Sequence, residues 1–168
     1  GLPACIYRPG YVTGHSLTGV WNPDDFLCRM IKGCIQLGSY PDLPQSKLDM
    51  SPVNFCSRAI TNLFRNRKSL RIYQAYHLVN PTEFFFNSLF ETAIKLGYTL
   101  EKVSYPEWKN RLYQSTVEKK SENTDKDENA LYPMITHFSD DYERRMTEKR
   151  PWYDNQNTLK ALNETGIT

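Results

Sequence analysis

The sequence predicts an α/β fold in which strands and helices alternate. Short runs of β-forming residues at 4–7, 70–78 and 98–104 are separated by segments with apolar residues at helical spacing. Pro and Gly residues stand near the ends of these segments, where they start or stop regular structure. Alternation of this kind is typical of a few mainly parallel strands joined by right-handed helical crossovers.

Length and composition narrow the class of protein further. The 168 residues are enough for one ordinary domain, and the 39% apolar and 24% charged content is that of a globular chain. A net charge of +2 is too small to attract nucleic acid or an anionic membrane surface strongly. No apolar run approaches the roughly 20 residues that span a bilayer. We therefore expect neither a nucleic-acid nor a membrane partner.

A first helix is expected after Trp21. Asn22 is its expected N-cap, because a short polar side chain there accepts a hydrogen bond from the first turn, and Pro23 suits the first helical position. Gly38 is a natural C-terminal stop. Gly33, inside the helix, costs about 1 kcal/mol relative to alanine, so it predicts close packing at that point. The expected core face contains Phe26, Met30, Ile31 and Cys34.

Proline marks the expected starts of three further helices, at 51–52, 80–81 and 105–106. Shorter helices are expected within 130–138 and 158–162. The charged run at 118–129 is interpreted as a solvated helix end plus a flexible loop, with an interaction segment as the alternative. The expected core faces are Val53, Cys56, Ala59, Ile60 and Leu63 in the first of these helices, and Phe85, Leu89, Ala93 and Leu96 in the second.

The cysteines indicate a reducing compartment. Cys5, Cys28, Cys34 and Cys56 lie among apolar neighbours and include no Cys-x-x-Cys pair, and the three histidines complete no zinc-site spacing. Free cysteine behaves as a small apolar residue, so we expect reduced, buried thiols. The first ten residues also lack the pattern of a signal peptide. A cytoplasmic location is therefore expected.

Three functional motifs are nearly present but fail. The segment 14–19 has two glycines, yet Thr18 stands where a nucleophile elbow needs glycine, and Val20 and Trp21 stand where a P-loop needs Lys and Ser or Thr. Two Tyr-x-x-x-Lys pairs occur, at 98–102 and 105–109. The first lies on an expected strand, where residues four apart are about 13 Å apart, and the second precedes proline, which disfavours helix at its tyrosine. Both are interpreted as core or surface residues.

One block of sequence carries a specific resemblance. It reads YRPGYVTGHSLTG at 7–19, NPDDFLCR at 22–29, KGCIQLG at 32–38 and LDMSPV at 48–53. This block closely resembles the thioester reductase family, which comprises the terminal reductase domains of nonribosomal peptide and polyketide synthases. Aminoadipate reductase and carboxylic acid reductase are near relatives, and the members are extended short-chain dehydrogenases/reductases. The resemblance runs in register from the first residue to about Trp108.

The resemblance implies a partial NAD(P)-binding Rossmann-like fold. In the family the Gly-rich dinucleotide turn and the catalytic Tyr and Lys precede the segment that matches 6–10, and a Gly-x-Gly-x-x-Gly turn is absent from this sequence. We therefore expect residues 1–168 to be the C-terminal half of such a domain, with no catalytic residue of its own. Within it, 1–38 would be the end of the cofactor fold and the first helix, and 39–168 mainly a substrate-binding subdomain.

The resemblance also assigns candidate site residues. Pro9, Gly10 and Val12 would line the nicotinamide of NADPH, with main-chain groups of Val12 meeting its carboxamide; the alternative is that Pro9-Gly10 is only a turn. His15 and Ser16 would contact the thioester substrate or its pantetheine arm, or would be structural. Met50 would line the substrate channel or belong to the core. Arg29 and Lys32 are interpreted as a solvated helix face rather than a phosphate contact.

The expected function is NADPH-dependent release of a carrier-bound acyl or peptidyl thioester as aldehyde or alcohol. The expected partners are a phosphopantetheinylated carrier protein and the N-terminal half of the same domain. Two alternatives remain: an aminoadipate reductase-type domain of lysine biosynthesis, and a carrier-docking module without catalysis of its own. No metal is expected.

Overall fold

The computed structural model describes residues 4–66, 74–122, 128–148, 153–163 and 165–167. The chain forms two compact units, each built from segments that are distant in sequence. Unit 1 comprises Gly1–Trp21, Leu48–Phe84 and Arg150–Thr168. Unit 2 comprises Asn22–Lys47 and Phe85–Lys149.

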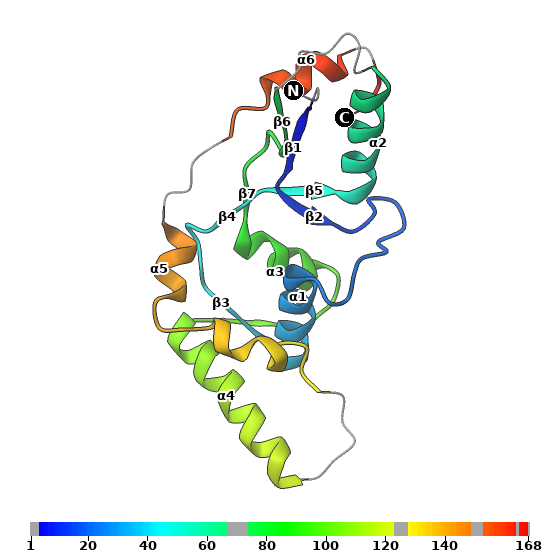
Figure 1. Cartoon of the computed structure of the whole chain (residues 1–168). Coiled ribbons are helices and arrows are strands. Elements are labelled where there is room, and N and C mark those ends of the chain that lie inside the picture. The colour runs from blue at the N-terminus through cyan, green and yellow to red at the C-terminus, as the bar shows by residue number, and fades with distance from the viewer. Residues whose placement is uncertain (1–3, 67–73, 123–127, 149–152, 164, 168) are drawn as a thin grey trace. The chain divides into compact units, whose positions relative to one another are not determined.

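Unit 1 contains two pairs of parallel strands covered by helices (Figure 1). In the first pair, β1 (Ile6–Pro9) lies beside β6 (Ala75–Leu78). In the second, β2 (Tyr11–Thr13) lies beside β5 (Met50–Pro52). The helices are α2 (Val53–Arg65) and α6 (Gln156–Leu162). The parallel pairing confirms the α/β fold that the alternation of strand and helix patterns predicted.

The core of unit 1 lies between these strands and helices. Cys56, Ala59 and Leu63 recur at helical spacing on the buried face of α2. They meet Tyr76 and Leu78 of β6. The apolar face predicted for α2 is confirmed at these three positions; Val53, at the first helical position, is 41% exposed.

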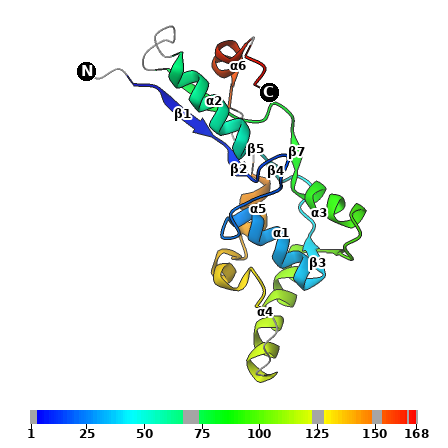
Figure 2. The same ribbon diagram turned by 90° about the vertical axis from the view of Figure 1, so that its right-hand side faces the viewer.

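Unit 2 is mainly helical around one parallel strand pair, β3 (Ser39–Pro41) with β8 (Glu101–Val103). In both views α1 lies beside β3; α4 packs against both at one end, and its other end extends away from them (Figure 2). The two-residue strands β4 (Lys47–Leu48) and β7 (Phe84–Phe85) lie where the chain passes from one unit to the other. The helices are α1 (Phe26–Leu37), α3 (Phe86–Lys95), α4 (Tyr105–Glu122), the 3-10 helix η1 (Tyr132–His137) and α5 (Tyr142–Thr147).

Aromatic side chains form much of the core of unit 2. Trp108 and Phe138 are fully buried and meet edge to face, with ring centroids 5.0 Å apart. Tyr40 stacks on Phe90 with centroids 4.6 Å apart. Close packing at Gly33 is confirmed, because a Cβ atom there would lie 2.3 Å from Cγ of Leu131.

Three predicted helix starts are wrong. α1 begins at Phe26 rather than Pro23, because the Asp25 side chain accepts from the N–H groups of Leu27 and Cys28 (2.9 and 3.3 Å). Asn22 instead accepts from the N–H of Asp24 in the preceding turn. The C-terminal end is as predicted, since Gly38 takes a left-handed conformation with φ of 72°.

The other two helix starts differ for similar local reasons. Ser51 is a strand residue whose hydroxyl donates to the carbonyl of Leu78, so α2 starts only after Pro52. The side chain of Asn80 accepts from the N–H of Thr82, and α3 begins six residues beyond Asn80. The helix predicted to start at 105–106 is α4. Tyr105 is its first residue, whereas the proline that follows predicted that Tyr105 lies just outside the helix.

Two predicted apolar faces need correction. In α3 the buried residues are Phe86, Phe90 and Ala93, whereas Leu96 is 75% exposed. Because three phenylalanines stand in a row at 84–86, an apolar helical face could begin at Phe85 or at Phe86. The structure has the face that begins at Phe86. The buried face of α1 contains Leu27, Met30, Gly33 and Cys34. Of the residues predicted for this face, Met30 and Cys34 are buried, and Phe26 and Ile31 are only half-buried.

Several predicted segments are shorter or partly undescribed. Of the strands predicted at 70–78 and 98–104, only Ala75–Leu78 and Glu101–Val103 are extended, and 70–73 lie outside the described residues. Residues 118–122 of the charged run form the end of α4, as predicted. Residues 123–127 lie outside the described residues, so the flexible loop expected there stays a prediction. The short segment predicted within 130–138 is a 3-10 helix, and α5 was not predicted.

The four cysteines are free, as predicted. Cys34 and Cys56 are buried, and burial raises the pKa of both thiols. Cys5 and Cys28 are half-buried rather than buried. No described helix combines the length and the apolar character that crossing a membrane requires.

Candidate functional site

The strand ends of unit 1 bring the predicted cofactor residues together. β1 and β6 are parallel and in register, with Pro9 opposite Leu78, so both strands end at the same edge. The Gly10 N–H donates to the Leu78 carbonyl oxygen across that edge (3.3 Å). In open α/β sheets, ligands bind outside the carboxyl ends of the parallel strands. The carboxyl ends of β1 and β6, with the residues that follow them, are therefore the candidate site.

Gly10 is enclosed by Asp49. A Cβ atom on Gly10 would lie 2.6 Å from the carboxyl carbon of Asp49 and 2.8 Å from its main-chain oxygen. The same main-chain oxygen accepts from the N–H of Tyr11 at 2.7 Å. Only glycine lets the two segments approach this closely. The Pro9-Gly10 turn is thus held against the start of β5.

Asp49 also holds the end of β6. Its Oδ1 atom accepts from the main-chain N–H of Asn80 at 2.9 Å, and the side-chain amide of Asn80 donates to the carbonyl of Met50 at 3.4 Å. Burial raises the pKa of the Asp49 carboxyl, while the bond from Asn80 acts in the opposite direction. Asp49 therefore connects the ends of β1 and β6 with the start of β5.

Sequence reasoning did not identify Asp49 or Asn80 as residues of the site. Both carry a signal that was available: Asp49 is a charged residue between the apolar Leu48 and Met50, and Asn80 stands two residues after the end of a predicted strand. Polar residues at the carboxyl ends of parallel strands are where a site is expected. Their mutual contact, however, joins positions 31 residues apart and follows only from the fold.

Val12 presents a free strand edge. In a parallel pair of strands, the main-chain groups of successive residues point alternately toward the partner strand and away from it. The N–H of Tyr11 donates to Asp49 on the β5 side. The N–H and C=O of the next residue, Val12, therefore point away from β5. Among the described strands, β5 is the partner of β2. The outer edge of β2 therefore offers a donor and an acceptor side by side. That pair fits a ligand carboxamide, which has one group of each kind.

Met50 lies on the other side of β2, in the partner strand β5. It is the first residue of β5, it is half-buried, and it stands opposite Tyr11 in the ladder. The structure therefore brings together four of the predicted site residues, which are Pro9, Gly10, Val12 and Met50. Their contacts with cofactor or substrate stay predictions.

His15 and Ser16 organise the loop that follows β2. Nδ1 of His15 accepts from the main-chain N–H groups of Leu17 and Thr18, both at 3.3 Å. Ser16 and the side chain of Asn54 form two hydrogen bonds of 3.0 Å: the Ser16 N–H donates to Oδ1 of Asn54, and Nδ2 of Asn54 donates to the Ser16 hydroxyl. These bonds tie the loop to the first turn of α2, and substrate contact by either residue stays a prediction.

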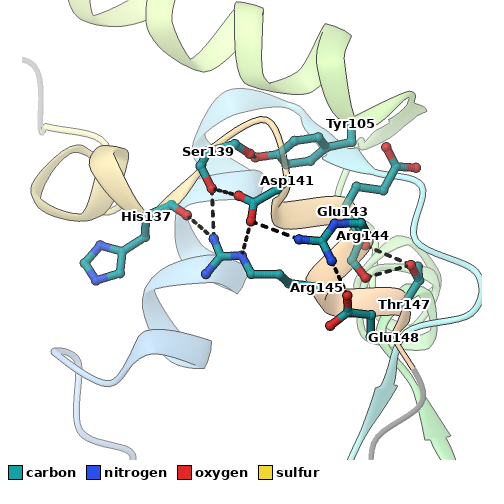
Figure 3. A network of polar contacts seen from close by, with 9 residues as sticks. All are labelled: Tyr105, His137, Ser139, Asp141, Glu143, Arg144, Arg145, Thr147 and Glu148. Carbon is teal, nitrogen blue, oxygen red and sulfur yellow. Dashed lines mark hydrogen bonds and ion pairs between the residues drawn. The ribbon is translucent and has the colours of Figure 1, made fainter.

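The two Tyr-x-x-x-Lys pairs lie in unit 2, and Figure 3 shows Tyr105 of the second pair beside Ser139. The Tyr105 hydroxyl donates to the carbonyl of Ser139 at 2.8 Å, and burial raises the pKa of Tyr105 well above its ordinary value. Lys109 forms an ion pair with Asp140 at 2.6 Å. The network around Ser139 continues through Arg145, which binds Ser139 and the Asp141 carboxylate. Tyr105 therefore anchors α4 to the segment before α5.

The remaining candidates also lie in unit 2. Tyr98 is 50% exposed, and Lys102 approaches Asp42 at 3.9 Å. Arg29 is paired with Asp24 and donates to the carbonyl of Ala130, while Lys32 is exposed. In the part of the chain that the structure describes, no cluster of His, Cys, Asp and Glu side chains could hold a metal ion.

Comparison with known proteins gives the family of this chain. Residues 1–60 match an NAD-binding family model described as male sterility protein. The chain is 34% identical to the non-canonical nonribosomal peptide synthetase hkm10 of Aspergillus hancockii, over 96% of this chain and 15% of that protein. It is also 34% identical to the L-2-aminoadipate reductase of Saccharomyces cerevisiae, over 96% of this chain and 11% of that protein. The chain thus spans less than a sixth of these relatives.

A solved structure supports the same relationship. The terminal R domain from the myxalamid PKS-NRPS biosynthetic pathway superposes with a TM-score of 0.79 and 36% sequence identity. The superposition covers 100% of this chain and 40% of that structure. The fold is therefore that of Rossmann-like reductase domains, and the chain is homologous to NAD(P)-dependent reductase domains. Within that class, the chain is homologous to the terminal reductase domains of nonribosomal peptide and polyketide synthases and is related to aminoadipate reductase.

Proposed function

We propose that residues 1–168 are the C-terminal part of an NADPH-dependent thioester reductase domain. The whole domain would release an acyl or peptidyl chain, held as a thioester on a carrier protein, as an aldehyde or alcohol. The observation that carries this proposal is the edge formed by Gly10 and Val12, which the contacts of Asp49 hold in place. Residues 1–38 would complete the cofactor fold, and 39–168 would mainly bind substrate.

In this proposal Pro9, Gly10 and Val12 form a wall against the nicotinamide ring. NADPH, when bound, supplies the hydride. The outward N–H and C=O of Val12 would hold the carboxamide and so fix which face of the ring is presented. Hydride transfer needs the reacting atoms about 3–3.5 Å apart, so the contribution of these residues is positioning. Asp49 would keep the wall in place through its contacts at Tyr11 and Asn80.

Other parts of the chemistry would come from another segment of the parent protein. A Gly-x-Gly-x-x-Gly turn is absent from the sequence, and the Tyr and Lys of the family's catalytic pair would lie with it. Donation of a proton or hydrogen bond to the developing oxyanion would therefore be the work of that segment. His15, Ser16 and Met50 would face the thioester and the pantetheine arm.

Two other functions are compatible with the homology. An aminoadipate reductase-type activity is favoured by the 34% identity to the yeast enzyme. A carrier-docking module without catalysis of its own is the other alternative. The aminoadipate alternative changes the substrate and keeps the role of the Val12 edge. The docking alternative removes that role.

Reconstitution tests the proposal. Residues 1–168 alone should give no NADPH-dependent reduction of an acyl-pantetheine thioester, whereas adding the remainder of the parent reductase domain should restore aldehyde formation. Aminoadipyl-pantetheine as a second substrate separates the lysine-pathway alternative. Turnover by residues 1–168 alone would contradict the proposed division of labour. Binding of a phosphopantetheinylated carrier without any turnover after reconstitution would favour the docking module.

A further inference from the structure

Positive charge is concentrated in one stretch of this chain. Residues 50–82 contain five basic residues and no Asp or Glu. The whole chain carries a net charge of only +2, so the remainder is net negative. The basic residues of this stretch are Arg58, Arg65, Arg67, Lys68 and Arg71. An anionic ligand that meets this chain is therefore attracted to the stretch that contains α2.

Two of these arginines line a groove in unit 1. The groove has a volume of about 330 Å³ and lies between the exposed side of α2 and the segment 165–167. Arg58 and Arg65 are seven residues apart, which places them on one side of the helix and about 10 Å apart along its axis. Thr61 and Asn62 line the groove between them. Its described lining contains no acidic side chain.

The donors of the groove are partly oriented already. One guanidinium nitrogen of Arg58 donates to the carbonyl of Gly166 at 3.4 Å, which directs the group toward the segment 165–167. A guanidinium has five N–H donors, so this bond leaves others for a ligand. The hydroxyl group of Thr61 adds a neutral donor, and Ile167 supplies an apolar surface.

We propose that this groove binds a phosphate ester. Guanidinium groups match phosphate oxygens with paired hydrogen bonds, and the groove volume lies in the range of small-molecule sites rather than that of a single ion. The phosphate would lie between Arg58 and Arg65, with the organic part against Thr165 and Ile167. This site is separate from the Val12 edge and does not depend on the proposed reductase activity.

Calorimetric titration of the whole chain tests this site with matched pairs of probes. The pairs are phosphopantetheine with pantetheine, and adenosine 2′,5′-bisphosphate with adenosine. They distinguish an arm carried by a protein from a nucleotide as the source of the phosphate. We expect at least one phosphorylated probe to bind more than tenfold more tightly than its unphosphorylated partner, and more weakly as salt rises.

Substitutions of the two arginines locate the site. Arg58→Gln with Arg65→Gln should weaken that binding at least tenfold, and Arg58→Lys should weaken it less because the charge is retained. Lys160→Gln, at an exposed position of α6 in the same unit, is the control and should change affinity less than twofold. Equal affinity for both members of each pair, or an equal loss in the Lys160 variant, would overturn the proposal. So would binding of a Glu-rich peptide with no binding of any phosphate ester.

Discussion

Gly10 and Asp49 lie so close that no side chain fits on Gly10: a Cβ atom would be 2.6 Å from the Asp49 carboxylate. Replacing Gly10 by alanine should therefore lower the free energy of unfolding by about 2 kcal/mol, the usual cost of overpacking. Urea denaturation measures this change. In the double variant with Asp49→Ala, part of the loss should be recovered, because the two positions are in contact. Strictly additive effects would contradict the observed proximity.

Asp49 should also make stability depend on pH. Burial raises the pKa of its carboxyl above the ordinary value of 3.8. Below pH 3.8 the group is protonated in both folded and unfolded chains and causes no penalty. As pH rises through the interval between the unfolded and folded pKa values, ionisation of the buried group lowers the free energy of unfolding.

The variant Asp49→Asn isolates this contribution. Its side-chain oxygen can still accept from the Asn80 N–H, but it does not ionise. The free energy of unfolding of wild type minus that of the variant should fall as pH rises above 3.8 and then level off. A difference that stays constant, or that rises with pH, would mean that the pKa of Asp49 is not raised.

Asp25 rather than Asn22 caps α1. Asp25→Ala should lower the free energy of unfolding by about 1 kcal/mol, the usual value of an N-cap. The neighbouring Asp24→Ala serves as control, because it removes the same charge and leaves the cap intact. Asp24→Ala should lower the free energy of unfolding by less, since Asp24 is largely exposed and its ion pair with Arg29 lies at the surface. Equal effects of the two variants would argue against the cap.

Tyr105 should prove structural in the complete reductase domain. Tyr105→Phe removes the hydrogen bond to Ser139 and should cost about 1 kcal/mol of stability. NADPH-dependent turnover by the parent domain should stay within twofold of wild type at a temperature where both are folded. A loss of turnover of a hundredfold or more, with the fold intact, would instead identify Tyr105 as a catalytic residue.

Local sequence signals predicted the elements well where one residue decides the outcome. Gly38 ends α1 because it readily adopts a positive φ, and the period of Cys56, Ala59 and Leu63 identified the buried face of α2. The register of α3 was not predictable in this way. Three consecutive phenylalanines satisfy two helical faces equally, and tertiary packing selected Phe86 and Phe90.

The site was predictable only in part. The motif predicted Pro9, Gly10 and Val12 as site residues; Pro9 and Gly10 lie at the carboxyl end of β1 and Val12 lies in β2, and their contact with a cofactor stays a prediction. The connecting role of Asp49 depends on contacts with Tyr11 and Asn80, which are distant in sequence. Hydrogen bonds of this range follow from the fold and have no local pattern. For the same reason the pairing of Ser16 with Asn54 was not foreseen.

The most direct test of the account uses the main chain of Val12. Proline at position 12 removes an N–H that points away from β5, so it should leave the parallel ladder intact. In the complete reductase domain, Val12→Pro should weaken NADPH binding at least tenfold, measured by fluorescence titration, whereas Val12→Ala should stay within twofold of wild type. Unchanged NADPH affinity in a folded Val12→Pro domain would contradict the claim that this edge holds the nicotinamide.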